Sequence, residues 1–458
     1  MKTKKTKQQG QKIVELADKI GERTASEAQR EWDNKTVIRV PSTAGDEMTV
    51  ILNRPLPSLV AQNRRITKSR PSTPPSISCF NPRHSFKRDY TSVMIVPTGI
   101  GAAIGGYAGD ALPVARTLSS VVDCLITHPN VLNAAMLYWP MPNALYVEGY
   151  ALDRFAEGSW GLMPVHQNRV GLVLDAGIEE QLRVRHLQVA DAARASLGLP
   201  VVEYVVTDTP LQVEKWIDPK SGQSTGRIKH PDSLLRAVQA LLKHSQVNAV
   251  AVVGRFPDDD DVQDTDDYRK GMGIDLLAGV EAVISHLVVK EFQIPCAHAP
   301  ALSSLPLSPS LCPKSAAEEL GYTFLPCVLA GLSNAPQYLV KNSESENGCI
   351  LASDVDSVIL PVDAFGGDGV LAFARSKRNS PLIIAVEENE TVLDDTPDKV
   401  GVEVVKVSNY WEAIGVIAAH KAGVNPHSLR RNTIKNIQFT SLLPANGYAI
   451  KVPHQLAD

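Results

Sequence analysis

The chain has 458 residues, 44% of them hydrophobic and 21% charged, which is ordinary for a globular protein and long enough for two domains. Its formal net charge is −4, but residues 1–90 hold 18 Lys and Arg against 9 Asp and Glu, so the rest of the chain is acidic. An acidic body argues against a nucleic-acid enzyme, and no apolar run reaches the roughly 18 residues of a membrane-spanning helix. The six cysteines form no CxxC pair, which is typical of reduced thiols.

The first 90 residues are expected to form a basic extension and linker outside the main fold. Apolar residues recur at helical spacing in residues 11–33, and the strand-like runs KTVIRV and MTVIL follow. Residues 48–88 then contain eight basic residues and no acidic one, around the run RPSTPPSIS. This composition is typical of a flexible linker or surface loop. An organellar transit segment has a similar composition, but the position inside the chain disfavours that alternative.

From residue 91 onward, apolar strand-like runs alternate with amphipathic helical segments. The strand-like runs are SVMIVPTG, RVGLVLDAG, VVEYVVTD, VNAVAVVGRF, DSVILPVDA, PLIIAVEEN and VEVVKVSN. The helical segments between several of them are residues 112–126, 179–198, 231–245 and 411–423. Near-continuous apolar strands separated by such helices predict parallel sheets covered on both faces, with ligands at the carboxyl ends of the strands.

A glycine-rich stretch, IVPTGIGAAIGGYAGDALPVARTL, begins in the first of these runs. Glycines are costly to order unless the backbone must approach a neighbour closely. A glycine turn followed by Pro113 and an apolar helical face predicts a helix N-terminus that can hold a phosphate or carboxylate, with Asp110 as its cap or as a contact to a ligand hydroxyl. A tight turn that needs glycine only for packing, and a dinucleotide fingerprint one residue too long, are the alternatives. The expected ligand-binding residues here are Thr98, Gly99, Gly101, Gly105, Gly106, Gly109 and Asp110.

A second glycine loop lies downstream, in VILPVDAFGGDGVLAFARSK. It is expected to form the opposing half of the same anion site, so that Gly106 and Gly367 face one cleft. The next strand ends in acid and amide side chains that suit hydroxyls, amines or a metal. An ordinary turn with a solvated acidic end is the alternative. The expected ligand-binding residues of this region are Asp363, Gly366, Gly367, Gly369 and Asn389.

Polar residues between the two loops complete the expected site. THPNVLNA supplies ligand-binding Asn130 and Asn133. GRFPDDDD supplies Arg255 beside four carboxylates, which either hold a divalent cation or form a solvated loop. Catalysis near neutral pH needs groups whose pKa can be tuned, and the acid–base candidates are His128, Glu148, Glu387 and Glu388.

The motif ISHLVVKEFQIPCAHAPAL contains three side chains of zinc-binding type, His286, Cys296 and His298, at a spacing that matches no standard zinc site. Cys296 and His298 lie two residues apart on a strand and can share one face, so a cysteine nucleophile with a histidine base is a further alternative. Buried structural residues are favoured over both, and no metal site is predicted.

Over residues 91–430 the chain resembles a family of cyanobacterial and plastid-lineage proteins known only as a domain of unknown function. The motifs that carry this resemblance are IVPTGIGAAIGGYAGD, THPNVLNA, NALYVEG, ISHLVVKEFQIPCAHAPAL and IIAVEENETVLD. The resemblance supplies no activity. It implies an enzyme-like protein of the cytoplasm or plastid stroma.

Two segments are locally similar to nucleotide-sugar enzymes. GGYAGDALPVARTL is similar to a loop of the transferase that adds N-acetylglucosamine to the lipid-linked peptidoglycan precursor, although Asp110 stands where that loop has His. DAFGGDGVLAFARSKRNSPLIIAVEEN is similar to a segment of the epimerase acting on uridine-diphosphate N-acetylglucosamine, although the Glu that binds ribose and an Arg are missing. The similarity implies two Rossmann-like parallel-sheet domains facing a cleft, residues 91–300 and 301–458, behind an N-terminal helix and strand extension in residues 1–90.

The sequence therefore predicts an α/β enzyme of small-molecule metabolism that binds a phosphate- or carboxylate-bearing ligand between two glycine-rich loops. The alternatives are a nucleotide-sugar transferase or epimerase, a metal-dependent hydrolase or lyase, and a non-catalytic metabolite-binding protein. The cofactor is unassigned, with Mg²⁺ or a nucleotide-containing substrate as candidates. A small molecule is the expected partner and a homo-oligomer is an open option, while no nucleic acid and no membrane span are expected.

Overall fold

A computed structural model describes residues 36–41, 47–52 and 88–437, apart from residues 134–136, 138, 259–266, 304–306, 320–323, 341–347, 377–379, 432 and 435. The chain divides into two compact units, residues 1–84 and 85–458. In the first unit, strands β1 (Thr36–Pro41) and β2 (Glu47–Leu52) pair antiparallel, as the two strand-like runs predict. The expected helix at residues 11–33 and nearly all of the basic segment 48–88 lie outside the described residues.

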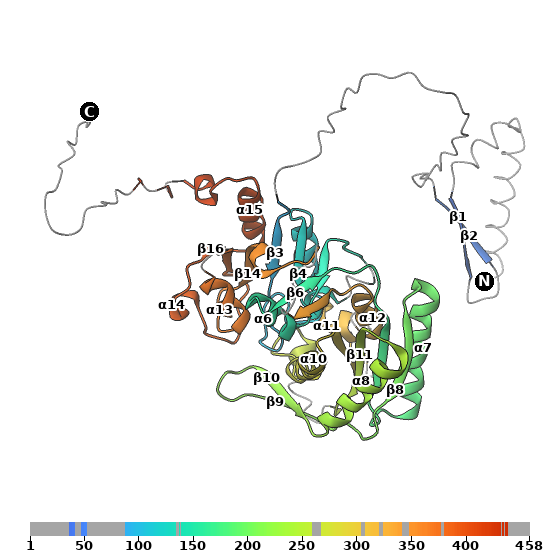
Figure 1. The fold of residues 1–458 in the computed structure, drawn as a ribbon. Helices are drawn as coiled ribbons and strands as arrows, with labels where there is room; N and C mark the ends of the chain where they lie inside the picture. The colour runs from blue at the N-terminus through green and yellow to red at the C-terminus, as the bar shows by residue number, and fades with distance from the viewer. Residues whose placement is uncertain are drawn as a thin grey trace, which may run out of the picture. The chain divides into compact units, whose positions relative to one another are not determined.

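The larger sheet of the second unit consists, in the described chain, of six parallel strands in the order β16-β15-β14-β3-β4-β5 (Figure 1). Their bounds are β3 (Thr91–Met94), β4 (Cys124–Thr127), β5 (Ala144–Tyr146), β14 (Val355–Pro361), β15 (Leu382–Val386) and β16 (Val405–Val407). Numbered along the chain, this order is 3-2-1-4-5-6, that of the dinucleotide-binding α/β fold. The sheet draws strands from both sides of residue 300, so strand pairing does not follow the division expected there.

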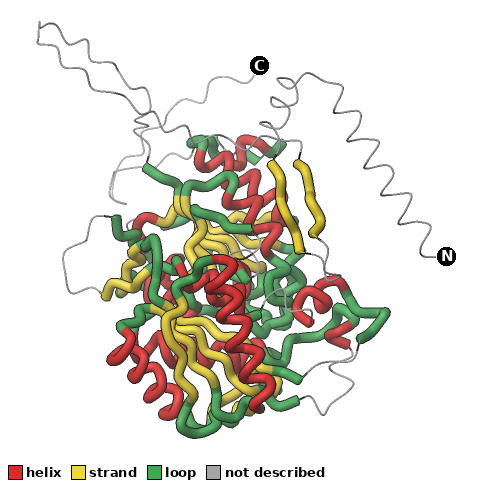
Figure 2. The backbone as a smooth tube through the Cα atoms, turned by 90° about the vertical axis from the view of Figure 1, so that its right-hand side faces the viewer, coloured by secondary structure: helices red, strands yellow, loops and turns green. Residues whose placement is uncertain are grey.

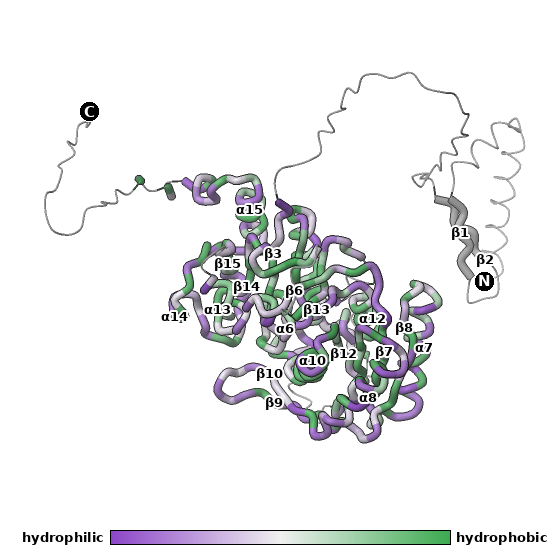
Figure 3. Tube along the Cα trace, in the orientation of Figure 1, coloured by the Kyte–Doolittle hydropathy of each residue, from purple (hydrophilic) through white to green (hydrophobic). Residues whose placement is uncertain are grey.

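The smaller sheet contains, within the described residues, four parallel strands in the order β12-β11-β7-β8. They are β7 (Val170–Leu174), β8 (Val201–Val206), β11 (Ala249–Arg255) and β12 (Cys296–Ala301). Two antiparallel pairs accompany it: β6 (Trp160–Met163) with β13 (Gln337–Val340), and the hairpin of β9 (Val213–Ile217) and β10 (Ser224–Ile228). Figure 3 shows hydrophobic colouring along the interior strands and hydrophilic colouring at the tip of this hairpin.

Helices cover both faces of each sheet, as Figure 2 shows for the second unit. On the larger sheet, Met94 packs with α3 (Leu112–Ser119) and α15 (Tyr410–Lys421), whereas Val93 packs with α6 (Gly149–Ala156) and α13 (Asp368–Arg375). On the smaller sheet, α7 (Glu180–Leu197) and α12 (Leu325–Ser333) cover one face, and α8 (Pro231–Ser245) and α10 (Ala278–Phe292) cover the other. Every residue of β7 is buried, which is the burial that parallel strands with two covered faces require. The predicted Rossmann-like α/β fold is confirmed.

Five short elements complete the described fold: α4 (Pro129–Leu132), α11 (Pro313–Glu319), α14 (Pro397–Val400) and the 3₁₀ helices η1 (Ala352–Asp354) and η2 (Pro426–Leu429).

The helix predicted over residues 112–126 is shorter than expected, and its last part is strand β4. The hydroxyls of Ser119 and Ser120 donate to carbonyls of the preceding turn, at 2.9 and 2.6 Å, and such local bonds compete with helix continuation. Asn143 then donates to the carbonyls of Ser119 and Val122, which fixes the turn into β4. Tertiary pairing of β4 between β3 and β5 therefore overrides the helical spacing of the apolar residues.

The glycine-rich stretch after β3 is a folded turn, and its backbone conformation requires several of its glycines. Gly99, Gly101, Gly105 and Gly109 all have positive φ, the region that glycine adopts without strain. At Gly105 a Cβ atom would lie 2.5 Å from Cγ1 of Val96, so the turn packs too closely for any side chain. Buried Asn389 holds the turn in place, because its amide accepts from the N–H of Ile104 at 2.8 Å and donates to the carbonyl of Ile104 at 2.9 Å.

Replacing Gly105 by alanine is expected to lower the free energy of unfolding by about 3 kcal/mol, because the new Cβ meets Val96 while the backbone stays at positive φ. Gly423→Ala is the matched control and should cost about 1 kcal/mol, since Gly423 has φ +78° and a Cβ atom there would meet no heavy atom within 4 Å. Urea denaturation followed by circular dichroism measures both losses. Equal losses in the two variants would contradict the close packing at Gly105.

Candidate active site

A cavity of about 1390 Å³ lies at the carboxyl ends of strands from both sheets. The loops after β3 and β14 both reach it, and these neighbouring strands mark the point where the order of the larger sheet reverses, the usual ligand position in such folds. Its size exceeds the usual range of small-molecule pockets. The lining residues used below are Thr98, His128, Asn130, Asn133, Glu148, Asp153, Arg185, Asp275, Glu281, Ser285, His286, His298, Glu318 and Gly367.

Glu148 is a carboxylate of the cavity that is held by two backbone N–H groups. It directly precedes α6, and its Oε2 accepts from the N–H groups of Tyr150 at 2.8 Å and Ala151 at 3.3 Å, which caps that helix. Its Oε1 forms an ion pair with Nδ1 of His286, which comes from α10. Gly149 leaves room for the imidazole, because a Cβ there would lie 3.1 Å from Cε1 of His286.

The imidazole of His286 favours its charged form. Burial by itself lowers the pKa of His286, but the charge and hydrogen bond of Glu148, followed by the charge of Asp153, outweigh burial and raise it. Glu148 is only 3% exposed, whereas the His286 side chain is 43% exposed and lines the cavity. A buried carboxylate therefore holds a protonatable ring in contact with the cavity.

Asp153 caps the helix that follows the second glycine loop. Its Oδ1 accepts from the N–H of Gly369 at 3.0 Å, in the first turn of α13, and a Cβ at Gly369 would lie 2.5 Å from that oxygen. Burial raises the pKa of Asp153 to about 6, although the Gly369 N–H and His286 oppose the rise. The N-termini of α6 and α13 thus already bind the carboxylates of Glu148 and Asp153.

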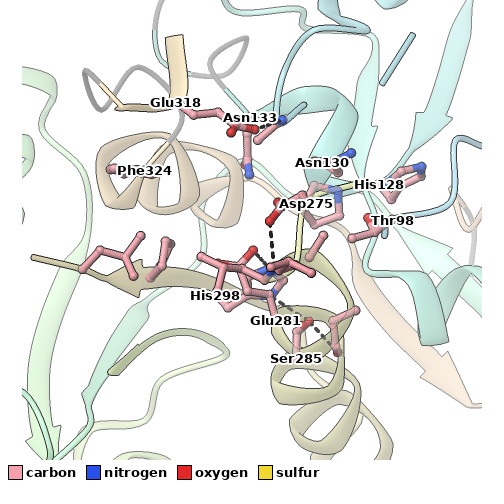
Figure 4. Close-up of a pocket in the computed structure, with 18 of the residues that line it drawn as sticks. Thr98, His128, Asn130, Asn133, Asp275, Glu281, Ser285, His298, Glu318 and Phe324 are labelled. Atoms are coloured by element: carbon pink, nitrogen blue, oxygen red, sulfur yellow. Dashed lines mark hydrogen bonds and ion pairs between the residues drawn. The ribbon is translucent and has the colours of Figure 1, made fainter. Parts of the chain in front are cut away.

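A second histidine, His298 on β12, forms a separate contact set in the cavity (Figure 4). Its Nδ1 lies 3.1 Å from Oγ of Ser285, and its Nε2 lies 3.8 Å from Oε2 of Glu281. Burial, with the nearby charge of His286, lowers the pKa of His298 to about 3, so this ring is neutral at neutral pH. Burial followed by the charges of Asp275 and Glu318 raises the pKa of Glu281 well above its usual range.

The three side chains of zinc-binding type do not form a metal centre in the described part of the chain. No group of three or more His, Cys, Asp or Glu side chains among the described residues is arranged to hold a metal ion. Cys296 is buried in the core with Val288, and burial, with Glu148 nearby, raises the pKa of its thiol well above its usual range. A thiol of that kind stays protonated and is a poor nucleophile.

One wall of the cavity carries only neutral polar side chains. Figure 4 shows Thr98, His128 and Asn130 on the same side of the pocket. The N–H of Val96 donates to Nε2 of His128 at 2.9 Å, and burial lowers the pKa of His128 to about 4. His128 is therefore neutral near pH 7, which suits a hydrogen-bonding role better than the acid–base role predicted from the sequence.

Six of the residues predicted to bind ligand or to act in catalysis meet in this cavity, and the others lie outside its lining. Those that line it are Thr98, His128, Asn130, Asn133, Glu148 and Gly367. Those that do not are Gly99, Gly101, Gly105, Gly106, Gly109, Asp110, Arg255, Asp363, Gly366, Gly369, Glu387, Glu388 and Asn389. The sequence predicts that Gly106 and Gly367 face one cleft, but Gly367 lines the cavity and Gly106 does not.

Most of the residues outside the lining have a partner that explains them. Asp110 pairs with Lys314 at 2.8 Å, and Arg255 pairs with Glu179 and Asp258, each at 2.9 Å. Asp363 accepts from the N–H and the hydroxyl of Thr391 at 2.8 and 2.9 Å. Glu387 and Glu388 are exposed beyond the end of β15.

Sequence reasoning missed several cavity residues, among them Asp153 and Ser285. Asp153 follows Glu148 by five residues and lies on a helix whose other inward residues are apolar, and this lone acid was the available signal. Ser285 directly precedes His286 on α10, and its relation to His298 depends on the packing of that helix against β12.

Replacing Glu148 by glutamine is expected to lower the pKa of His286, because the stabilising charge is removed while an amide oxygen can still cap α6. Since the folded-state pKa of His286 is raised, the pair stabilises the fold below the ordinary histidine pKa, and this contribution disappears as pH rises through the raised value. NMR titration of the His286 ring protons measures the shift. Glu403→Gln, at an exposed glutamate, is the control, and an unchanged pKa in Glu148→Gln would contradict the pairing.

Comparison with known proteins agrees with the resemblance noted in the sequence. The family model described as "Protein of unknown function (DUF3326)" matches residues 91–430. The chain is 59% identical over 343 residues to an uncharacterised lipoprotein of a Synechococcus strain. The aligned region covers 75% of this chain and 94% of that protein. No solved structure matches. None of the helices in the described residues is long and apolar enough to cross a membrane. The chain belongs to the DUF3326 family.

Proposed function

We propose that this chain is an enzyme of small-molecule metabolism that uses His286 as its proton donor and acceptor. The observation that carries the proposal is the contrast within one ion pair: Glu148 is 3% exposed, and His286 is 43% exposed and lines the cavity. A group whose pKa is shifted by a fixed partner, and which faces a large cavity, is typical of acid–base catalysts.

The two ring nitrogens of His286 have different surroundings and can have different roles. Nδ1 faces Glu148, whose position is fixed by two backbone N–H groups, so the ring is held in one orientation. Nε2 is then the nitrogen that can exchange a proton with a ligand. Burial raises the pKa of Asp153, which lies beside this pair, to about 6, so Asp153 can also change its charge just below neutral pH.

The charges of the lining bear on which ligand would bind. The sequence predicts that an anionic ligand binds at the glycine-rich turns before α3 and α13. The predicted glycines of the first turn do not line the cavity, and the N–H of Gly369 in α13 binds Asp153. The cations available to an anionic group in the lining are instead His286 and Arg185. An anion bound next to His286 would also raise its pKa, so the predicted phosphate or carboxylate remains compatible with the acid–base proposal.

A nucleotide-sugar enzyme is a second candidate. The observation in its favour is that the loops after β3 and β14, where the local similarities lie, meet the cavity at the reversal point of a 3-2-1-4-5-6 sheet. This support concerns the fold and does not reach the chemistry. The compartment, cytoplasm or plastid stroma, and a homo-oligomeric state stay predictions.

Purified protein incubated in D₂O with a cell extract of small molecules is expected to consume or deuterate at least one compound, as measured by mass spectrometry. His286→Gln is expected to reduce that rate by about 100-fold or more, the usual contribution of a general acid or base. His166→Gln, at an exposed histidine outside the cavity, should leave the rate unchanged. Equal rates in the two variants would contradict the role of His286, and tight binding without turnover would favour a metabolite-binding protein.

If the second candidate is correct, uridine-diphosphate N-acetylglucosamine is expected to protect the protein against thermal unfolding in a concentration-dependent way, because a ligand that binds only the folded state stabilises it. Uridine and N-acetylglucosamine, tested separately, are the controls. If millimolar nucleotide-sugar does not protect the protein against thermal unfolding, the nucleotide-sugar function is refuted and the acid–base proposal is unaffected.

A further inference from the structure

We infer that His128 and Asn133 together bind a carbonyl oxygen of the substrate, as two neutral hydrogen-bond donors on one wall of the cavity. This inference rests on the proposed function, because it assigns a substrate class to the same cavity. The two residues flank the single-turn helix α4, His128 directly before it and Asn133 directly after it.

His128 presents an N–H group of fixed position. Its Nε2 accepts the N–H of Val96 at 2.9 Å, so that nitrogen carries no proton and Nδ1 carries the ring hydrogen. No described residue accepts from Nδ1, although His128 is only 7% exposed and lines the cavity. The donor therefore faces the cavity without a protein partner, where a ligand atom or water can accept from it.

Asn133 presents a second hydrogen-bond donor to the cavity, the NH₂ group of its side-chain amide. Its Oδ1 accepts the hydroxyl of buried Tyr146 at 3.0 Å, which orients the amide and leaves its NH₂ group for another acceptor. In the described chain no residue accepts from this NH₂ group, and the side chain is 9% exposed in the lining. Two nearly buried donors, one from each end of α4, thus lack an acceptor within the described structure.

The charge of the remaining lining decides between the oxygen groups that could accept from these donors. Glu148 and Asp153 supply negative charge, and the buried acids Asp275, Glu281 and Glu318 cannot ionise easily, since burial raises the pKa of all three. The cationic side chains His286 and Arg185 belong to α10 and α7, so a group with a full negative charge would bind near them and not at the two neutral donors. A neutral carbonyl oxygen accepts two hydrogen bonds without adding charge. Two such bonds also withdraw electron density from the carbonyl carbon, which helps proton transfer next to it.

The test compares matched six-membered rings: cyclohexanone, cyclohexanecarboxylate and cyclohexylamine, each titrated against the full-length protein and followed by saturation-transfer NMR. We expect cyclohexanone to bind wild-type protein saturably and not to be displaced by an equal concentration of the carboxylate, which would contact His286 and Arg185 instead. Asn133→Asp replaces the donor by an acceptor and can still accept from Tyr146, and it should weaken cyclohexanone binding about tenfold. Asn425→Asp makes the same change at an exposed helix cap outside the lining and should not alter binding.

Three results would overturn the inference: no saturable binding of cyclohexanone to wild-type protein, displacement of the ketone by an equal concentration of the carboxylate or the amine, or equal ketone affinity in Asn133→Asp and Asn425→Asp. A second measurement does not depend on the stability of any Asn133 variant. Long-range ¹H–¹⁵N spectra of wild-type protein near pH 7, assigned with His128→Gln, should show His128 neutral and protonated at Nδ1. A charged ring, or a proton on Nε2, would overturn the inference as well.

The failure of this inference can be distinguished from that of the proposed function. Cyclohexanone binding does not require proton exchange at His286, so it should persist in His286→Gln even though turnover is lost. Loss of ketone selectivity with His286-dependent turnover intact would refute the carbonyl site alone. Ketone binding that depends on Asn133, without any turnover of extract compounds, would refute the enzyme and keep the site.

Discussion

The carboxylate of Glu148 forms an ion pair between elements that cover the two different sheets of this protein, at its cavity. It caps α6, which covers the larger sheet, and it pairs with His286 of α10, which covers the smaller sheet. A buried charge is expensive to remove from water, and Glu148 is compensated by two backbone N–H groups and by the half-exposed ring of His286. The packing of α6 against α10 and the charge state of the cavity therefore depend on the same contact.

This contact also changes the interpretation of the glycine-rich loops. In many α/β proteins a glycine turn exposes helix amides to an anionic ligand. Here the helix after the second glycine loop, α13, binds Asp153 through the N–H of Gly369, and α6, which follows neither glycine-rich loop, binds Glu148 in the same way. Gly149 and Gly369 are required by the close approach of His286 and Asp153, and Gly105 is required by its own turn. The glycines build the walls of the site by letting elements approach closely.

The cavity consequently separates its polar groups into two kinds. Glu148, Asp153 and His286 form an ionisable set, in which the pKa of His286 is raised by its carboxylate neighbours and that of Asp153 is raised by burial to about 6. His128 and Asn133, together with Thr98 and Asn130, form a neutral set on the wall supplied by the larger sheet. A charged group that moves a proton, together with neutral groups that hold an oxygen, is an arrangement suited to chemistry at a polar bond of the substrate.

The sequence by itself determined the local part of this structure. Continuous apolar runs predicted seven of the parallel strands and the parallel α/β class, because burial on both faces requires apolar residues along each strand. Three of the four proposed helices lie within a residue or two of their observed ends.

Tertiary structure decided the rest. The residues of β4 have helical spacing, and only their pairing between β3 and β5 makes them a strand. The return of β14 beside β3, and the packing of α10 against α6, place residues more than 100 positions apart in one cavity, and spacing along a chain carries no record of such contacts. That is why Glu148 and His128 were found from the sequence, whereas Asp153, the partner of Glu148 and the neutral state of His128 became visible only in the folded protein.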